Sequence, residues 1–279
     1  MAPRNWTRAE LLLAMNLYCR LPFGKLDRKT PEVIALATAI GRTASSVGMK
    51  LCNLASLDPA HQARGIKGLS GASNADRAIW AEFHADWATL VEESAAYESE
   101  LLNREQLPSD HPRPVLRERV ARNEPGEGVP ALPTDLAIAL RSAADTEAIR
   151  SVKVRTAQDF FRRAVLASYR TTCCISGIAL PELLVASHIL PWGQFPDRRV
   201  DPRNGLCLSR LHDTAFDRGL ITFDADLRLV LSCELRDQVT NSVLSASFAH
   251  FAGQPLRLPD KFQPERENLR RHREEVFRG

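Results

Sequence analysis

The sequence predicts an α+β protein, in which an all-helical domain with a helix-turn-helix outline precedes a domain of short strands and a short helix. Three observations support this fold class. Helix start and stop signals fill residues 7–53, a proline-rich stretch follows at 108–134, and β-prone runs begin only after residue 180. We therefore expect a helical domain at 1–107, a linker with partial helix at 108–150, a second domain at 151–240, and an extension at 241–279 that packs on the second domain.

The first helix is predicted over 8–19. Thr7 and Glu10 have the spacing of a capping box, in which each side chain satisfies a backbone N–H that the first helical turn leaves unpaired. Pro31 fits the first position of a second helix, and Gly41 is a natural left-handed stop. A third helix follows at 44–53.

The second and third helices, joined through Gly-Arg-Thr, have the outline of a helix-turn-helix whose last helix can enter the major groove of DNA. On this interpretation the DNA contacts would be Arg42, near a phosphate, and the groove-facing Ser45, Ser46, Lys50 and Asn53. The alternative is a helical packing or dimerisation module whose polar residues are merely solvated. Beyond it, apolar residues recur every three to four positions over 75–106, which predicts one amphipathic helix that packs on this unit.

The second domain is predicted to open with a helix at 156–169 that buries Phe160 and Phe161. A β-prone run at 183–189 follows, then a second strand and a short helix at 210–217. Apolar and polar residues alternate on both sides of an Asp-Ala-Asp turn, which predicts a closing β-hairpin at 220–232. The order of elements is strand, loop, strand, helix.

Charge and cysteine content set broad limits. The net charge of +3 does not by itself indicate a nucleic-acid-binding protein, but residues 151–220 hold ten Lys and Arg against six Asp and Glu. None of the six cysteines forms a C-x-x-C pair, so we expect reduced thiols. We find no signal-peptide core and no apolar run long enough for a membrane span, and we expect a cytoplasmic protein.

Three polar residues in the second domain have the types that phosphodiester hydrolysis needs. His188 follows a β-prone run and is our candidate general base, because imidazole titrates near neutral pH. Asn204 would brace the loop or orient His188 through its amide. His212 would face the same cleft as a metal ligand, and Asp213 or Asp217 could add a hard oxygen suited to Mg²⁺ or Mn²⁺.

These residues resemble the HNH endonucleases, whose domain has the ββα-metal fold. The motifs that carry the resemblance are Ser-His-Ile-Leu-Pro at 187–191, Asn-Gly-Leu at 204–206 and His-Asp-Thr-Ala-Phe-Asp-Arg-Gly at 212–219. The resemblance covers 156–232 and implies a metal-dependent nuclease. More loosely, the amino-terminal unit is similar to the segment that precedes such domains in bacterial proteins related to restriction endonucleases.

Two positions depart from the broader HNH pattern. Many HNH sites carry an acidic residue or His directly before the base, where this chain has Ser187, a poor metal ligand. Many also rest on a tetracysteine zinc site, whereas here Cys174 is followed by Gly177 and Cys207 has no C-x-x-C mate. We expect a divalent ion, Mg²⁺ or Mn²⁺, and no structural zinc.

The sequence thus favours a DNA endonuclease acting in restriction or phage defence, on double-stranded DNA and with a homodimer as an option. Phosphate contacts are expected from arginines around the motif, with solvated charges as the alternative: Arg198, Arg199, Arg203 and Arg210. Two other functions stay open. One is a DNA-binding regulatory or assembly protein with an inactive HNH domain, for which Ser187 is the best argument, and the other is an RNase.

Overall fold

The computed structural model describes residues 4–65, 71–105 and 134–279, and describes side chains within these ranges except at 102–105 and 134–150. Most of the expected linker, residues 108–133, lies outside the described residues. The helices of the amino-terminal part are α1 (Arg8–Arg20), α2 (Pro31–Ala39), α3 (Ala44–Ala55), α4 (Pro59–Ala63), α5 (Asn74–Ala85) and α6 (Trp87–Glu105), with a 3-10 turn η1 (Phe23–Lys25).

Helix α1 is the central element of this part. It begins with the predicted capping box, in which Thr7 Oγ1 accepts from the Glu10 N–H and Glu10 Oε2 accepts from the Thr7 N–H at 2.9 Å. Every residue from Ala9 to Cys19 is buried, because α3, α5, α6 and α7 surround the helix. The short helices α2 and α3 follow at the predicted places, separated by Gly41 with a φ of 67°.

The prediction of a single amphipathic helix over 75–106 is wrong, because two helices, α5 and α6, cover this range and meet at Asp86. Asp86 has extended backbone angles (φ −147°, ψ 86°), and its carboxylate accepts from the Thr89 N–H at 3.0 Å, which caps the start of α6. The apolar periodicity continues across the break, because Phe83 and Trp87 both bury their rings in the same core.

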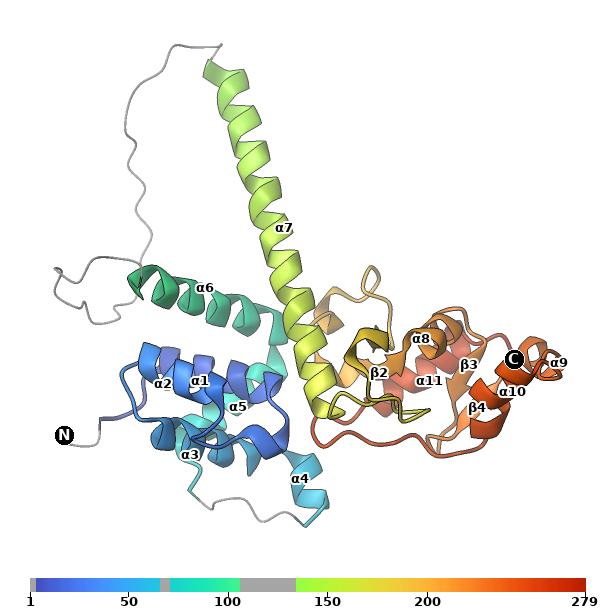
Figure 1. Cartoon of the computed structure of the whole chain (residues 1–279). Coiled ribbons are helices and arrows are strands. Elements are labelled where there is room, and N and C mark those ends of the chain that lie inside the picture. Colours follow the sequence, from blue (N-terminus) through green and yellow to red (C-terminus); the bar gives the residue numbers. More distant parts are fainter. Residues whose placement is uncertain (1–3, 66–70, 106–133) are drawn as a thin grey trace.

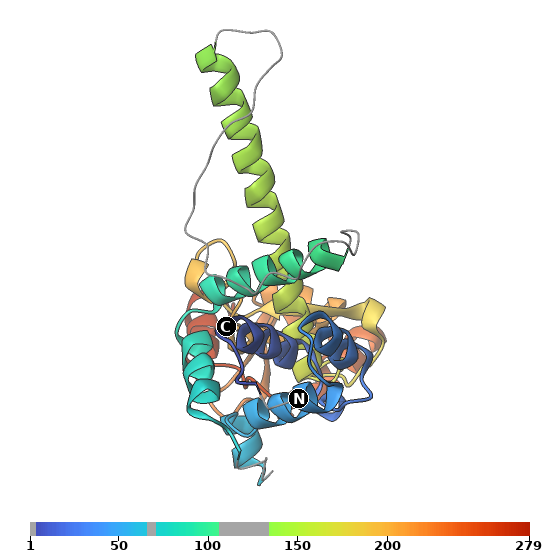
Figure 2. The same ribbon diagram turned by 90° about the vertical axis from the view of Figure 1, so that its left-hand side faces the viewer.

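Helix α7 (Thr134–Ser168) joins the two parts of the molecule (Figure 1). Its amino-terminal portion extends away from the rest of the described chain in both views (Figures 1 and 2). Its carboxy-terminal portion is buried on two sides. Phe160 and Ala164 lie in the core of the amino-terminal helices, whereas Phe161 and Val165 lie in the core of the carboxy-terminal part.

The carboxy-terminal part contains two small antiparallel sheets, so the chain mixes helices and sheets as an α+β protein does. Strand β1 (Leu184–His188) pairs with β2 (Gly205–Ser209), in the register that sets His188 opposite Gly205, and α8 (Arg210–Asp217) follows β2 directly. The predicted hairpin is present as β3 (Ile221–Phe223) and β4 (Leu229–Leu231). The remaining elements are η2 (Pro181–Leu183), η3 (Pro196–Arg198), η4 (Pro202–Asn204), α9 (Cys233–Asp237), α10 (Ser242–Ser247), η5 (Ala249–Phe251) and α11 (Arg266–Glu275).

The tail after β4 ties the two parts together. Leu269 of α11 packs in the carboxy-terminal core, and Lys261 reaches the amino-terminal one. The buried Lys261 ammonium donates to the carbonyl oxygens of Tyr18, Cys19 and Leu21 at 2.6, 3.0 and 2.7 Å. Two carbonyl groups in the last turn of α1 and a third just after it thereby gain a hydrogen-bond donor. Among the described helices, none is long and apolar enough to cross a membrane.

Candidate active site

His188 ends β1 in a setting that defines its protonation. Its ring stacks on Phe161 of α7, with centroids 3.7 Å apart, and the Trp192 ring meets it edge-on at 5.4 Å. Its Nε2 lies 2.9 Å from the carbonyl oxygen of Arg199. Because a carbonyl only accepts, Nε2 must carry the hydrogen, and Nδ1 keeps its lone pair. Burial lowers the pKa of His188, so the ring is neutral near pH 7 and Nδ1 can accept a proton.

Asn204 holds the loop that carries the partner of His188. Its Oδ1 accepts from the Leu190 N–H at 2.9 Å, and its Nδ2 donates to the carbonyl oxygens of Leu190 and Arg198 at 3.1 and 3.3 Å. The last of these is the peptide next to the Arg199 carbonyl that holds His188. Asn204 therefore fixes the backbone of the loop between β1 and β2. These bonds reach His188 only indirectly, through the loop that carries the Arg199 carbonyl.

Gly205 allows β2 to approach α7 closely. A Cβ atom at this position would lie 2.4 Å from Val165 Cγ2 and 2.9 Å from Phe161 Cζ. The Asn-Gly pair is therefore more than a turn signal. A side chain at 205 would push against the ring on which His188 stacks.

Helix α8 separates its polar residues onto two faces. His212 and Phe216, four residues apart, point into the core and are 2% and 0% exposed. Asp213 and Asp217 have the same spacing on the neighbouring face, and Asp217 is exposed. Helix α8 packs beside β1, which carries His188. Burial lowers the pKa of His188, and the Arg199 carbonyl and the charge of Asp213 raise it by less.

The expectation that His212 faces the cleft as a metal ligand does not match this structure. Both ring nitrogens are engaged, Nδ1 with Ser209 Oγ at 2.7 Å and Nε2 with the Ser247 carbonyl oxygen at 2.8 Å. The Sγ of Cys173 lies 3.7 Å from the same Nδ1. Burial raises the pKa of Cys173, but hydrogen bonds with His212 and Ser176 outweigh burial and lower it to about 6. The ring of His212 thus belongs to a buried polar cluster, and the motif spacing could not distinguish this from an open ligand.

Asp213 and Asp217 are the two carboxylates of α8 and the predicted oxygen ligands of a cation. Although Asp217 keeps part of its side chain at the surface, partial loss of water around its carboxylate and, to a lesser extent, the neighbouring charge of Asp213 raise its pKa to about 6. The part of the chain described here contains no group of three or more His, Cys, Asp or Glu side chains that could hold a metal ion. Mg²⁺ is nevertheless often bound through one or two carboxylates plus water and substrate phosphates. The pair therefore fits such an ion as a partial ligand set.

Ser187 does not stand beside this pair. Successive side chains of a strand point to opposite faces, so Ser187 points away from the face of His188. It is 2% exposed, and its Oγ has no hydrogen-bond partner among the described residues. Position 187 therefore does not supply a metal ligand next to His188.

Comparison with known proteins agrees with this geometry. Residues 173–224 match the family model HNH_2, described as HNH endonuclease. This segment is therefore similar to HNH endonuclease domains. The match spans β1, η4, β2, α8 and β3, which hold His188, Asn204 and the two α8 carboxylates. No curated protein matches the chain.

The four arginines expected to contact phosphates around the HNH motif differ in availability. Arg203 is bound to Asp201 through two nitrogens, and Arg198 lies 3.3 Å from Asp197 and 3.8 Å from Asp201. Arg199 packs its guanidinium over the Trp192 ring at 5.3 Å. Arg199 and Arg210 form no ion pair with any described residue, and Arg210 is exposed at the start of α8. Arg199 Nε also donates to the Trp192 carbonyl oxygen at 2.7 Å, so Arg210 is the less constrained of the two.

The expected DNA contacts of the amino-terminal part need correction. Arg42 forms an ion pair with Glu10 at 2.8 Å and packs over Trp6, and its side chain is only 9% exposed. Lys50 is buried and forms an ion pair with Asp76 at 2.6 Å. Both cations therefore stabilise the helical core and are not free to contact phosphates. The groove-facing candidates that remain are the uncharged ones: Ser45, exposed, and Ser46 and Asn53, partly exposed.

Two parts of the His188 site have no clear signal in the sequence. Phe161 supplies the stacking surface, although it reads only as an apolar position of a helix. The Arg199 carbonyl is a backbone group, so residue type carries no information about it.

Proposed function

We propose that this chain is a metal-dependent DNA endonuclease, in which the HNH segment adopts the ββα-metal arrangement and hydrolyses a phosphodiester bond. The observation that carries the proposal is the state of His188. Its Nε2–H donates to a backbone carbonyl, its Nδ1 keeps a lone pair that can accept a proton, and α8, which carries Asp213 and Asp217, packs beside β1.

Each residue then has a defined task. His188 Nδ1 takes a proton from the attacking water, because the neutral ring is the form that burial favours. Asn204 is a positioning residue that keeps the Arg199 carbonyl in place through the loop. Asp213 and Asp217 would hold a divalent ion, Mg²⁺ or Mn²⁺. When bound, such an ion supplies charge stabilisation at the phosphate.

Substrate binding follows from the free cations near this site. Arg199 and Arg210 would contact backbone phosphates, because neither is committed to a carboxylate of the described chain. We propose double-stranded DNA as the substrate, and restriction or phage defence as the role. The segments 1–107, 108–150, 151–240 and 241–279 would serve as DNA-docking domain, linker, nuclease domain and packing extension.

The test is cleavage of supercoiled plasmid in the presence of Mg²⁺ or Mn²⁺. Wild type should nick or linearise the plasmid, and His188→Ala should lower the rate by about 100-fold or more, as expected for loss of a general base. His250→Ala is the matched control, since His250 is exposed and lies on the η5 turn outside the HNH segment. If wild type leaves the plasmid intact under both metals, the endonuclease proposal fails.

A second candidate is a DNA-binding regulatory or assembly protein with an inactive HNH domain. It is favoured by the engagement of both His212 nitrogens and by the lack of a three-residue metal group in the described ranges. It predicts a plasmid mobility shift without nicking. The same assay with RNA in place of plasmid tests the alternative that the protein is an RNase. Light scattering on the DNA complex tests whether the protein is a dimer when it cleaves both strands.

A further inference from the structure

The segment 178–183, which leads into β1, exposes several apolar side chains in a row. All six of its residues are exposed, and five are apolar: Ile178, Ala179, Leu180, Pro181 and Leu183. The large ones, Ile178, Leu180 and Leu183, are 37%, 53% and 45% exposed. Single exposed apolar residues are normal on protein surfaces, whereas a cluster of them marks a site of interaction.

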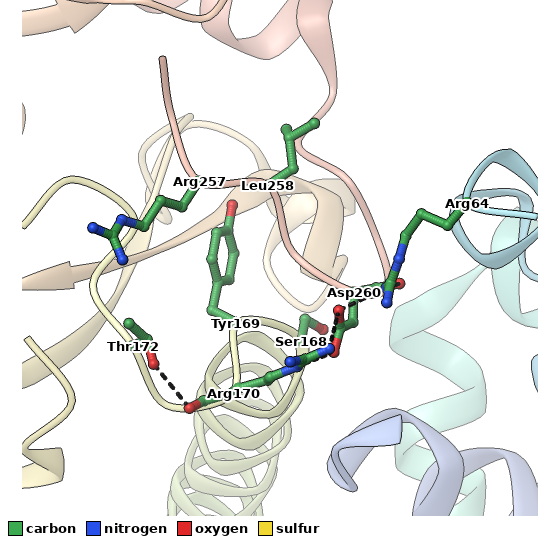
Figure 3. A pocket seen from close by; sticks show the side chains of 8 residues that line it. All are labelled: Arg64, Ser168, Tyr169, Arg170, Thr172, Arg257, Leu258 and Asp260. Carbon is green, nitrogen blue, oxygen red and sulfur yellow. Dashed lines mark hydrogen bonds and ion pairs between the residues drawn. The ribbon is translucent and has the colours of Figure 1, made fainter. Parts of the chain in front are cut away.

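Leu258 shows the ordinary case. It is 51% exposed, but it stands in the tail beside a cavity whose other lining residues include Arg64, Arg170 and Asp260 (Figure 3). Arg64 and Arg170 both bind the Asp260 carboxylate there. The surroundings of Leu258 are therefore charged, and it forms no apolar surface of the kind found at 178–183.

Backbone hydrogen bonds hold the exposed segment in a fixed shape. The Cys173 N–H donates to the Ile178 carbonyl oxygen at 2.8 Å, and the Leu183 N–H donates to the Leu180 carbonyl oxygen at 3.0 Å. Pro181 begins the η2 turn between them, and its ring fixes φ. Because the turn is already ordered, a partner that covers it pays little for ordering the backbone.

Leu211 extends this surface from a second segment. The β1–β2 register pairs Leu184 with Ser209, so α8 begins beside the end of the exposed segment. Leu211, the second residue of α8, is 47% exposed. We call the four residues Ile178, Leu180, Leu183 and Leu211 the η2 patch. His188 lies at the other end of β1, about 13 Å from Leu184 at the usual rise of a strand, so a partner on the η2 patch leaves His188 uncovered.

Two charges of opposite sign flank the η2 patch. Glu182 lies within the exposed segment, and Arg162 of α7 is held beside it, because its Nη1 donates to the Leu184 carbonyl oxygen at 3.2 Å. Both side chains are exposed, and neither forms an ion pair with a described residue. Nucleic acid does not suit this surface, because Glu182 would repel phosphates and the leucines would gain no apolar cover.

A second copy of the chain does suit it. In a two-fold dimer the same surface is used twice, so a residue that contacts another across the interface is contacted by it in return. One acidic and one basic group beside an apolar centre are then self-complementary. Glu182 of each copy meets Arg162 of the other, and no charge is left over.

We propose that the η2 patch joins two copies of this chain about a two-fold axis, with the apolar side chains at the centre and the two Glu182–Arg162 pairs at the rim. The association does not depend on the proposed cleavage. For an endonuclease, it would bring together two His188 sites, one for each strand of a duplex.

The first test is sedimentation equilibrium of the full chain at micromolar concentrations, without DNA or divalent ions. Wild type should sediment with twice the chain mass of 31.1 kDa. Leu183→Gln should raise the dissociation constant of the dimer by about tenfold or more, because each dimer loses two buried leucines. Ile34→Gln is the matched control, since Ile34 is also 45% exposed but lies on α2 of the amino-terminal part, and it should associate as wild type does.

Charge reversal tests the two-fold geometry. Glu182→Arg sets two positive groups opposite each other at both rims, and Arg162→Glu sets two negative ones there. Each variant alone should dissociate at concentrations where wild type is a dimer. An equimolar mixture of the two variants should recover the dimer, because every pair across the interface is again of opposite sign. A variant that had merely lost its fold would not recover on mixing.

The proposal is overturned if wild type is a monomer, if Leu183→Gln associates as tightly as wild type, or if the mixture stays monomeric. It is also overturned if Leu183→Gln keeps the mass of wild type but binds a duplex more weakly, which would assign the patch to DNA. Because mass is measured without DNA, a monomeric wild type that nicks plasmid refutes the dimer alone. A dimer that leaves plasmid intact refutes the proposed cleavage alone.

Discussion

Replacing His212 with Ala separates two roles for the second histidine of the HNH motif. As a metal ligand, His212 would set the concentration of Mg²⁺ at which cleavage is half-maximal. As a buried polar residue, it would set stability instead. The structure predicts the second outcome, because its two nitrogens bind Ser209 Oγ and the Ser247 carbonyl oxygen and the ring is 2% exposed.

The size of the effect follows from what the substitution removes. Two buried hydrogen bonds are lost at about 1 kcal/mol each, and the space of the ring adds a similar amount. We expect a loss of about 3 kcal/mol in the free energy of unfolding. In a protein of this size, that corresponds to a thermal midpoint about 6–12 °C lower.

The assays are urea unfolding and a Mg²⁺ titration of plasmid nicking, both below the midpoint of the variant. The half-maximal Mg²⁺ concentration for His212→Ala should stay within about threefold of wild type. Asp213→Asn and Asp217→Asn should raise it by about tenfold or more. The control is Asp237→Asn, an exposed carboxylate on α9. The reasoning is refuted if His212→Ala is as stable as wild type and needs at least tenfold more Mg²⁺.

Three further predictions concern packing and pH. Gly205→Ala should lower the free energy of unfolding by about 1–3 kcal/mol and slow nicking, because its Cβ would overlap Val165 and Phe161. Gly193→Ala is the control for the same urea and nicking assays and should have little effect, because its Cβ would have no atom within 4 Å. Burial lowers the pKa of His272 to about 4, so between about pH 6.5 and pH 4 the unfolded chain binds a proton that the folded chain does not. The free energy of unfolding should therefore fall by up to about 3 kcal/mol as pH drops through this range. If His272→Gln shows the same dependence of stability on pH as wild type, this prediction is contradicted. Initial nicking rates measured from pH 8 to pH 5 should fall around pH 6, because the pKa of Asp217 is about 6 and the protonated carboxyl is a poor ligand for a cation. A rate that rises toward pH 5 would exclude Asp217 as a metal ligand.

Local signals in the sequence were sufficient for most elements. The capping box at Thr7 and the left-handed Gly41 both act within a few residues of the chain, and the structure has both. The break at Asp86 was missed, because the apolar periodicity runs through it and only the capping bond to Thr89 shows the interruption. Boundaries set by one side-chain bond are hard to distinguish from a continuous helix.

The sequence by itself determined the likeness to HNH endonucleases, because that likeness depends on the types and order of His188, Asn204 and the α8 residues, which the chain shows without its fold. Only the tertiary structure decided which of these side chains face the site. Each residue of a helix is turned by about 100° from the one before it, so residues four apart lie on the same face. His212 and Phe216 are therefore buried together, whereas Asp213 and Asp217 lie on the neighbouring face. The same holds for Arg42 and Lys50, whose charges were visible in the sequence and whose buried partners, Glu10 and Asp76, were not. Residue type sets what a side chain can do, and long-range packing sets whether it is free to do it.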